Sequence, residues 1–489
     1  MGRAGLPLDD SWIHLHFARS LARGWGLAFE QGELVAGSTA PLWTALLSLL
    51  ALLPGSAVAW SQALGAAFFV LGAWGVHGLA RDLGVGPRLA GLATLLYATS
   101  GPLVWSAVSG LEIALFVLLA LSATRLHLRD RDTGRGLALS LPLFALATLA
   151  RPEGLLLLAA AVFDRALAVR GRWRDWARGL WLGGLLCGLL LAPVVLFNTL
   201  TSGSPLPTTF GAKTGVIGGL LPSLRYLHTV GGIVFRTQPY MTFLAAAGVV
   251  VLGQRLFTPR DRGLLPALWV IGLPVAYSCI SQGDSPLVGN FGRYYYPLLP
   301  FVICLGCVGL VPWAERLALD QRLRRRTLLP LALAVLLVAW PTLSHWRTTA
   351  GQFAQSVHDV EAGDAAAARW LRSRLEPGAT LAVNDIGVLK YLLPEHRMYD
   401  LAGIVTPEVH RFTAVAVAGG EPWEEGIARY LERVRPDYLV VFPDWFPRLL
   451  ASGVSFQPVA DFVVPGNITL GGDRLVIYST PWKDTAPTP

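Results

Sequence analysis

The stretch Leu8-Asp9-Asp10-Ser11-Trp12 places two adjacent carboxylates at the front of a chain that is otherwise mostly apolar. Ionised groups lose hydration close to hydrocarbon, so an acid pair at a membrane boundary is costly unless it is used. Long apolar runs begin after Trp43 and continue to about residue 343. We therefore interpret the rest of the chain as a helical scaffold built around this acid pair.

The composition predicts a polytopic membrane protein with limited soluble mass. Of its 489 residues, 53% are hydrophobic and 15% charged, whereas soluble domains are about 25% charged. The net charge of +8 comes almost wholly from arginine. In a membrane protein such an excess is first a topology signal, so no nucleic-acid partner is expected. The four cysteines lie in apolar runs and suggest no disulfide framework.

Apolar runs outline the membrane part, since a spanning helix needs about 20 apolar residues. Pro41–Leu53 is shorter and ends at Pro54-Gly55, which favours an interfacial segment that does not cross. The longer runs predict ten helices, near residues 58–80, 89–106, 110–126, 136–150, 154–170, 179–200, 240–257, 264–281, 296–312 and 327–343.

The loops between these runs predict the orientation of the chain. Every second loop is rich in arginine, with nineteen basic residues against five in the alternate loops. Cytoplasmic loops carry such an excess, so the arginine-rich set is assigned to the cytoplasm. Asp9 and Asp10, the loops 200–239 and 282–295, and everything after Trp346 then share the outer face.

The tail over residues 347–489 changes character and predicts a small α/β domain outside the membrane. Strand-like runs occur at Thr380–Asn384, Arg397–Asp400, Asp437–Phe442 and Arg474–Tyr478. Helical patterns at Asp364–Leu375 and Glu424–Val434 alternate with them. The expected fold is thus an all-α polytopic membrane domain over residues 1–346, followed by this α/β domain.

Asp9 and Asp10 are the first candidates for chemistry. Adjacent carboxylates raise one another's pKa, so one of them can act as a general base. The alternative is a helix N-cap with a first-turn acid before Ile13–Leu21, and the two roles are compatible. His14 favours a structural role, although the carboxylates with His14 are also a candidate set for a divalent cation such as Mg²⁺ or Mn²⁺.

Other polar residues of the predicted outer face are candidates for substrate binding. Glu112 starts an apolar helix, and Arg151 lies in the turn Arg151-Pro152-Glu153-Gly154, where an ordinary salt-bridged turn is the alternative. Lys213 is the only lysine before Lys390 and could meet a phosphate as a point charge. Arg293 precedes Tyr294 and is suited to bind phosphate oxygens in a bidentate manner.

Taken together, these motifs resemble the GT-C superfamily of integral-membrane glycosyltransferases, most closely the bacterial branch with the mycobacterial terminal arabinofuranosyltransferase. The aminoarabinose and protein O-mannosyl transferases are more distant. The resemblance covers most of the chain and rests on Asp9–Ile13, Arg19–Leu27, Gly32-Glu33, Gly37–Trp43, Ser109–Glu112, Ala150–Gly154, Pro205–Gly215, Arg293-Tyr294 and Asp385–Gly387.

The resemblance implies transfer of a sugar from a polyprenyl-phosphate donor to a glycan, lipid or protein acceptor at the outer face of the cytoplasmic membrane. Asp9 would be the base, with Asp10 as its support or as an alternative base. Lys213, Arg293 and, less directly, Arg151 would steady the leaving phosphate, and a single in-line step would invert the anomeric centre.

Two points remain open at the level of sequence. Family members have a transmembrane helix before the acid pair, whereas eight residues precede it here, so we expect a lost first helix or a start assigned too late. The rival function is a transporter or flippase of a lipid-linked sugar, which would use the same cationic and aromatic residues. Such proteins often show related halves, and the sequence shows no internal repeat.

Overall fold

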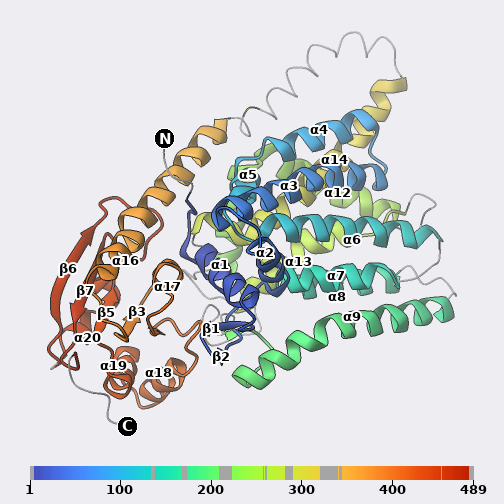
Figure 1. Ribbon diagram of the computed structural model, residues 1–489. Helices are drawn as coiled ribbons and strands as arrows, with labels where there is room; N and C mark the ends of the chain where they lie inside the picture. The colour runs from blue at the N-terminus through green and yellow to red at the C-terminus, as the bar shows by residue number, and fades with distance from the viewer. Residues whose placement is uncertain are drawn as a thin grey trace. The chain divides into compact units, whose positions relative to one another are not determined.

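The computed structural model describes residues 5–133, 138–167, 173–208, 223–256, 258, 261–280, 290–319, 340, 344–452 and 454–483 (Figure 1). Contacts between residues group the chain into two units. Unit 1 comprises Met1–Ser61, Val194–Lys213 and Gly351–Pro489, and unit 2 comprises Gln62–Pro193 and Thr214–Ala350. The predicted domain division after residue 346 concerns membrane insertion, not contacts, and it stays a prediction.

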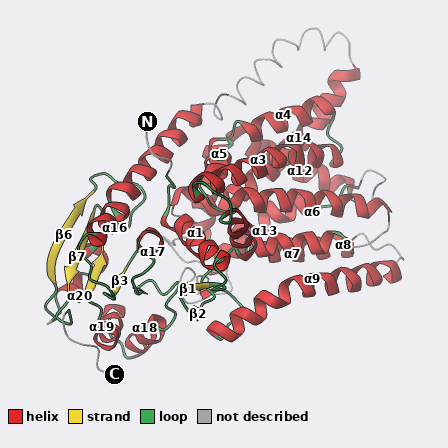
Figure 2. Ribbon diagram, viewed as in Figure 1, coloured by secondary structure: helices red, strands yellow, loops and turns green. Residues whose placement is uncertain are grey.

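The described residues of unit 2 form helices joined by turns (Figure 2). Two of these helices, α3 and α9, extend into unit 1 at one end. The helices are α3 (Ala57–Asp82), α4 (Pro87–Ala98), α5 (Gly101–Val108), α6 (Ile113–Thr133), α7 (Ser140–Ala150), α8 (Gly154–Leu167), α9 (Trp173–Ser202), α11 (Leu224–Thr237), α12 (Pro239–Arg255), α13 (Leu265–Ile280), the 3₁₀ helix η1 (Asn290–Leu298) and α14 (Leu299–Leu319).

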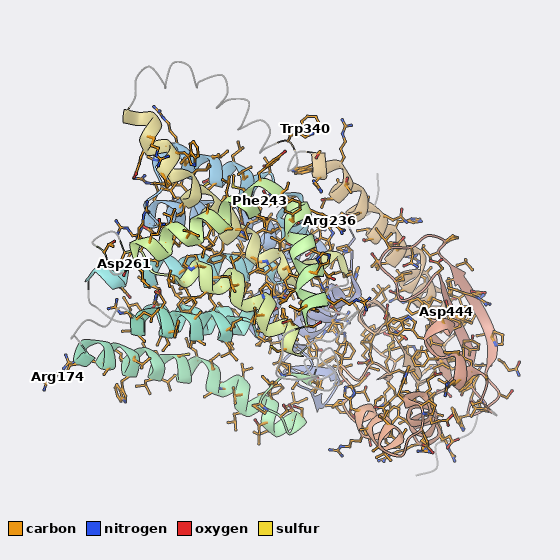
Figure 3. All side chains as sticks on the ribbon, turned by 180° about the vertical axis from the view of Figure 1, so that it is seen from behind. Arg174, Arg236, Phe243, Asp261, Trp340 and Asp444 are labelled. Atoms are coloured by element: carbon orange, nitrogen blue, oxygen red, sulfur yellow. The ribbon has the colours of Figure 1, made fainter. Side chains whose placement is uncertain are left out.

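Several of these helices can cross a membrane, as expected of a multi-pass membrane protein. Within the described residues, Ala57–Asp82, Ala177–Ser202 and Gly292–Arg316 are long and apolar enough to do so. Gly101–Val108 and Ile113–Asp130 pass the same test together, although they are bent by 115° at their junction. Figure 3 shows the charged Arg174 and Asp261 at one end of the helices, whereas exposed Phe243 lies along their length.

The predicted apolar spans agree closely with these helices. Each span predicted before residue 320 contains helix, and 327–343 lies outside the described residues apart from Trp340. The span 89–106 is divided between α4 and α5 at Thr99 and Ser100. Pro102 follows directly, and a proline both lacks an N–H and disfavours helix before it, which explains the break. Helix α11 was not predicted, because its polar residues resembled a loop.

Glycines allow the closest helix packing in unit 2. A Cβ at Gly248 of α12 would lie 2.0 Å from the main-chain oxygen of Leu305, and one at Gly309 of α14 would lie 2.3 Å from that of Leu244. Both backbones therefore touch where they cross. Small residues are the usual means of bringing helices together in a membrane, where burial of apolar surface offers little driving force.

Unit 1 contains the front of the chain and the C-terminal α/β part. Its front elements are α1 (Asp9–Ala22), β1 (Ala28–Glu30), β2 (Glu33–Leu34) and α2 (Pro41–Leu50). A helix over 344–362 leads into the C-terminal elements. These are α16 (Asp364–Arg372), β3 (Leu381–Val383), α17 (Gly387–Leu392), β4 (Met398–Asp400), α18 (Val409–Ala418), α19 (Trp423–Val434), β5 (Tyr438–Val441), the 3₁₀ helix η2 (Pro443–Trp445), α20 (Pro447–Leu450), β6 (Gln457–Val463) and β7 (Arg474–Ser479).

The C-terminal strands form one mixed sheet in the order β4-β3-β5-β7-β6. Strands β4, β3 and β5 are parallel, whereas β7 and β6 pair antiparallel at the other side. The four predicted strand-like runs coincide with β3, β4, β5 and β7. Strand β6 was not predicted, although Val459–Val463 alternates in exposure along the sheet edge.

The front of the chain completes the core of this α/β part. Ile13 and Phe17 of α1 and Phe29 of β1 are buried in the same cluster as Val383 of β3 and Ile477 of β7. Burying a large apolar side chain contributes about 1.5–3 kcal/mol, so this shared core is a substantial link. Helix α2 has ten residues and is too short to cross a membrane, in keeping with the interfacial segment predicted there.

Candidate active site

Asp9 and Asp10 are the first two residues of α1, after Leu8 with its extended backbone. Carboxylates in a first turn interact favourably with the positive end of the helix dipole. This is the structural role that the sequence left open beside catalysis. Asp9 also has contacts outside its own helix, and these place the acid pair against the α/β part of unit 1.

Asp9 bridges α1 to the start of α17. Its Oδ2 accepts the N–H of Gly387 at 2.8 Å, and its Oδ1 accepts that of Val388 at 2.7 Å. The first N–H groups of a helix have no partner within it, so a carboxylate is a fitting acceptor. A Cβ on Gly387 would lie 2.3 Å from the main-chain oxygen of Asp9. Glycine at position 387 therefore permits this approach.

Further carboxyl groups lie around Asp9 because parallel strands end at one edge. Asp385 follows β3 and Asp400 ends β4, and both strands run in the same direction. Asp364 at the start of α16 is fully buried, and neither of its carboxyl oxygens has a hydrogen-bond partner among the residues described. Ligands often bind at the carboxyl ends of parallel strands. The acid pair thus lies beside such an edge.

The grouping raises the pKa of these carboxyl groups. Burial, then the Asp385 charge, raises the pKa of Asp9 to about 8, while the N–H groups of Val388 and Gly387 oppose the rise. Burial is also the main cause that raises the pKa of Asp385 and of Asp400 to about 6. The pKa of Asp364 is raised by burial and by the charges of Asp385 and Asp9.

A carboxyl group with such a pKa is well suited to accept a proton near neutral pH. General bases are most effective when their pKa lies near the working pH. Each carboxylate oxygen has two lone pairs, and each Asp9 oxygen accepts one N–H from α17. Asp9 therefore retains acceptor capacity for a substrate hydroxyl while the backbone fixes its orientation.

A buried ion pair forms a second link between the front of the chain and the α/β part. The Lys390 Nζ donates to Glu30 Oε2 at 2.7 Å and to the His396 oxygen at 2.6 Å. Glu30 Oε1 accepts the N–H of Met398 at 2.9 Å. Lys390 is 1% exposed. A charge this deeply buried is tolerated because its partners are fixed in place.

The two histidines of α1 are buried. His16 shares a hydrogen bond of 2.9 Å with the main-chain oxygen of Phe29, and burial lowers its pKa to about 3, so it is neutral. His14 lies on the same helix and is 5% exposed. Within the described ranges, no three His, Cys, Asp or Glu side chains are grouped to hold a metal ion. A divalent cation with His14 and the carboxylates stays a prediction.

In unit 2, the predicted residues Glu112 and Arg151 form a buried network. Arg151 pairs with Glu112 at 2.8 Å and with Glu153 at 2.6 Å. The Tyr277 hydroxyl donates to Glu153 at 2.5 Å. One guanidinium thus faces two carboxylates, giving the three ionised groups a formal charge of −1. Arg151 is less suited to a phosphate than its charge alone suggested.

Arg293 and Tyr294 lie beside this network. The guanidinium carbons of Arg151 and Arg293 are 5.4 Å and 5.3 Å from the centroid of the Tyr294 ring. Cations within about 6 Å of a ring face are attracted by its quadrupole. Arg293 is 4% exposed, so its guanidinium lies inside unit 2. The structure therefore brings Glu112, Arg151, Arg293 and Tyr294 together.

Lys213 lies outside the described residues. Thr208, five residues earlier, belongs to unit 1, where its hydroxyl donates to the main-chain oxygens of Ala36 and Ile404 at 3.0 Å and 2.5 Å. The structure thus describes two sets of predicted residues, one in each unit. Their meeting in one cavity, with Asp9 on one side and Arg293 on the other, stays a prediction.

Some residues of the site were absent from the sequence prediction. Asp364 was read only as the start of a helix, and Glu30 and Lys390 were given no role. No local pattern joins residue 30 to residue 390. The available signal was Asn384-Asp385-Ile386-Gly387, where a glycine follows two polar residues at a strand end.

Comparisons with known proteins identify solved structures of similar fold and a C-terminal domain family whose function is unknown. Residues 350–478 match the family described as domain of unknown function DUF8728. No curated protein matches the chain.

The structure is similar to that of ArnT from Cupriavidus metallidurans in the apo state, with a TM-score of 0.59 and 16% identity over 96% of this chain and 93% of that one. ArnT bound to undecaprenyl phosphate gives a TM-score of 0.56 at 18% identity, with the same coverage. An oligosaccharyltransferase from Archaeoglobus fulgidus gives 0.54 at 13% identity, over 90% of this chain and 66% of that one. The predicted fold, a polytopic helical membrane domain with a small α/β domain, is confirmed, and these solved structures share it.

Proposed function

We propose that this chain is a membrane glycosyltransferase that moves a sugar from a polyprenyl-phosphate donor to an acceptor hydroxyl. The observation that carries the proposal is the Asp9 carboxyl, which is fixed by two N–H groups of α17 and has a pKa raised to about 8. The shared GT-C fold supports it, since the similar archaeal protein is named an oligosaccharyltransferase. ArnT has been solved with undecaprenyl phosphate, a polyprenyl phosphate of the class that the proposed donor would release.

The proposed reaction is a single displacement. Asp9, or Asp10 in its place, takes the proton of the acceptor hydroxyl as the oxygen attacks the anomeric carbon. The bond from that carbon to the phosphate oxygen breaks, and polyprenyl phosphate leaves with the electron pair. Attack opposite the leaving group inverts the anomeric centre. A retaining route would need a second carboxylate acting as a nucleophile.

Cations are needed where the phosphate leaves. We assign this role to Arg293 and Lys213, and we remove Arg151 from it because Glu112 and Glu153 already neutralise its charge. Arg151 instead orients Tyr294 and Glu112 beside Arg293. Thr208 is fixed in unit 1, and five residues span at most about 18 Å. A phosphate that Lys213 contacts would therefore lie within about 18 Å of Thr208, plus the length of the lysine side chain.

The finer assignments belong to the same proposal. They are membership of the branch with the mycobacterial arabinofuranosyltransferase, a location in the cytoplasmic membrane, and an α/β part on the outer face. The nineteen-to-five distribution of basic residues supports that orientation.

The test is a transfer assay on the purified full chain in liposomes, with labelled polyprenyl-phosphate pentoses and hexoses and a panel of hydroxyl acceptors. Wild type should form a covalent product with an inverted anomeric centre. Loss of a general base costs about 10²–10⁴-fold in rate, so Asp9→Asn or Asp10→Asn should lower turnover by that factor.

Asp444→Asn is the matched control, because this carboxylate is exposed on η2. Wild-type turnover in both acid-pair variants would end the proposal. Movement of labelled lipid across the bilayer without covalent product would favour the flippase instead.

A further inference from the structure

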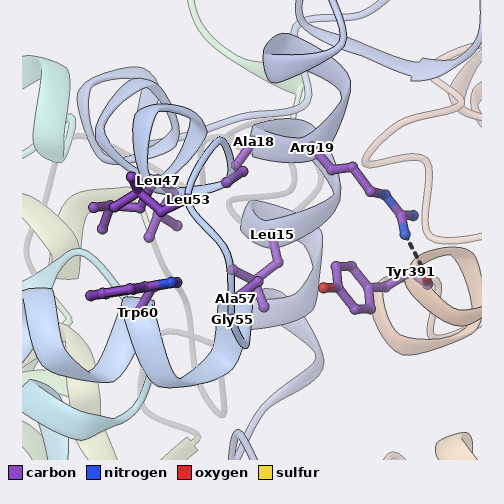
Figure 4. Close-up of a pocket in the computed structure, with 11 residues that line it drawn as sticks. Leu15, Ala18, Arg19, Leu47, Leu53, Gly55, Ala57, Trp60 and Tyr391 are labelled. Carbon is purple, nitrogen blue, oxygen red and sulfur yellow. Dashed lines mark hydrogen bonds between the residues drawn. The ribbon is translucent and has the colours of Figure 1, made fainter.

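A cavity of about 210 Å³ lies within unit 1. On α1 it is lined by residues from Leu15 onward, and Asp9, the first residue of α1, does not line it. Its walls come from the second half of α1, from α2 and the turn after it, from the first residues of α3, and from α17 (Figure 4). The lining residues are Leu15, Ala18, Arg19, Leu47, Leu50, Ala51, Leu53, Gly55, Ala57, Trp60 and Tyr391. It takes no part in the transfer reaction proposed above.

The two sides of the cavity differ in chemistry. In Figure 4, Leu47, Leu53 and Trp60 lie on one side, and Arg19 and Tyr391 lie on the other. The first side offers only apolar surface and the edge of an indole. The second offers a guanidinium and a phenol. A ligand that satisfies both must have a hydrocarbon part and an anionic part.

Arg19 is a cation without a carboxylate partner among the residues described. Its Nη1 donates to the main-chain oxygen of Tyr391 at 3.0 Å, and its Nη2 is 3.0 Å from His16 Nδ1. Its guanidinium carbon is 4.5 Å from the centroid of the Tyr391 ring. These neutral contacts fix its direction, and the carboxylate of Glu395 acts on its charge only through space, without an ion pair. A guanidinium has five N–H donors, so several remain for a phosphate.

The apolar side of the cavity continues to an exposed apolar surface. Leu49, Leu52 and Leu53 are 63%, 67% and 47% exposed at the end of α2 and in the turn after it. Leucines so exposed are costly in water and natural in contact with lipid. Because α2 is too short to span a bilayer, a position along the membrane surface suits it. A ligand can therefore enter from the lipid side.

We propose that this cavity binds one anionic phospholipid, with the phosphate at Arg19 and Tyr391 and part of one chain along Leu47, Leu50 and Trp60. The same ligand chemistry exists as free phosphate, which would use only the polar side. The bound lipid would lie between α1 and α17, the two elements that Asp9 also joins. The inference does not depend on the transferase proposal, since it concerns binding alone.

The experiment titrates the purified full chain in neutral detergent with phosphatidylglycerol and counts bound lipid by native mass spectrometry. Wild type should bind one phosphatidylglycerol tightly and phosphatidylcholine at least about tenfold more weakly. Arg19→Gln should weaken phosphatidylglycerol binding by about tenfold or more, as expected when hydrogen bonds to a charged group are lost. Excess inorganic phosphate should not displace the lipid.

Two further variants make the test decisive. Arg23→Gln is the charge-matched control, because Arg23 ends the same helix but lies over Trp25 and does not line the cavity. It should bind as wild type does. Leu50→Trp fills the apolar side and leaves the Arg19 contacts intact, so it should abolish binding even where Arg19→Gln unfolds. Unchanged binding in Arg19→Gln or in Leu50→Trp, or equal binding of phosphatidylcholine, would overturn the proposal.

Discussion

At Asp9, opposing forces act on a single carboxyl group. Burial and the charge of Asp385 favour its neutral form, and the N–H groups of Val388 and Gly387 favour its anion. The first pair of effects is larger, so the pKa rises to about 8. The same environment that makes the carboxyl a stronger base also keeps part of it protonated at neutral pH. Activity should therefore depend on pH in a defined direction.

We expect turnover to increase as the pH rises from 6 to 9, with a midpoint near the pKa of about 8 at Asp9. A base acts in its deprotonated form, whose fraction grows through that range. The measurement is the initial rate of transfer across the pH series, with product formation by Asp444→Asn measured in parallel. A rate that stays level over the whole series would contradict Asp9 as the titrating base.

Gly387 is the residue that permits Asp9 to approach α17. Gly387→Ala should lower the free energy of unfolding by about 1–3 kcal/mol, the usual cost of forcing an extra carbon into a packed place. It should also lower turnover, since Asp9 must shift from the two N–H groups. Thermal unfolding in detergent and the transfer assay measure the two effects.

Gly351→Ala is the control for that glycine, because a Cβ at Gly351 meets nothing within 4 Å. It should leave turnover unchanged and should raise the unfolding temperature slightly, because Gly351 lies inside the helix over 344–362, where alanine is favoured over glycine. The role given to Gly387 would be refuted if the two alanine variants behaved alike.

Among the elements of unit 2, the turn between α7 and α8 joins α6 through the Arg151 network. Arg151 holds Glu112 and Glu153, and both carboxylates are less than one-tenth exposed as side chains. Removing one partner of a buried ion pair leaves an uncompensated charge, which costs more than the pair itself contributes. The network should therefore be more important for stability than exposed pairs in the same unit.

Arg151→Met should lower the free energy of unfolding by about 3–5 kcal/mol. Arg129→Met, which removes a guanidinium that is 60% exposed beside Asp82, should cost about 0–1 kcal/mol. Adding Glu112→Gln to Arg151→Met should restore part of the loss, because one unpaired charge is removed. Thermal unfolding of the three variants measures these changes. Equal decreases in the free energy of unfolding for Arg151→Met and Arg129→Met would argue against a stabilising role of the network.

At the scale of the whole chain, the N-terminal residues of unit 1 pack against its C-terminal residues. The Lys390–Glu30 pair and the core residues Ile13 and Phe17 link segments more than 350 positions apart. Contacts across such separations are assembled late, because a long loop must close first. The unit 1 contacts thus depend on chain segments that lie on both sides of the helical unit in the sequence.

Lys390→Met should loosen unit 1 while leaving unit 2 intact. Glu30 would keep the N–H of Met398 but lose the cation that it pairs with, so amide exchange should accelerate in β1, α17 and β4. Hydrogen exchange followed by mass spectrometry measures each segment separately. Arg369→Gln, which breaks an exposed pair with Glu361, is the control and should change little. Faster exchange throughout α12 and α14 would show that the units are not independent.

Local sequence patterns sufficed for the helices and for the fold class. Runs of apolar residues predict helices wherever they are long enough, because every backbone group must be satisfied within lipid. Four strands of the α/β part followed from short runs rich in Val, Leu and Tyr in the same way. Strand β6 and helix α11 were not predicted, because their polar residues interrupt the apolar runs on which the prediction relied. Contacts with neighbouring elements stabilise them in the folded chain.

The sequence by itself determined that this chain is a helical membrane protein with an acid pair at its front, and its motifs resemble those of the GT-C superfamily. Only the tertiary structure decided what surrounds that pair. Asp9 meets Gly387 and Val388, Glu30 meets Lys390, and Arg151 meets two carboxylates that cancel its charge. Hydrogen bonds and ion pairs depend on distances of about 3 Å in space, and spacing along the chain does not encode those distances.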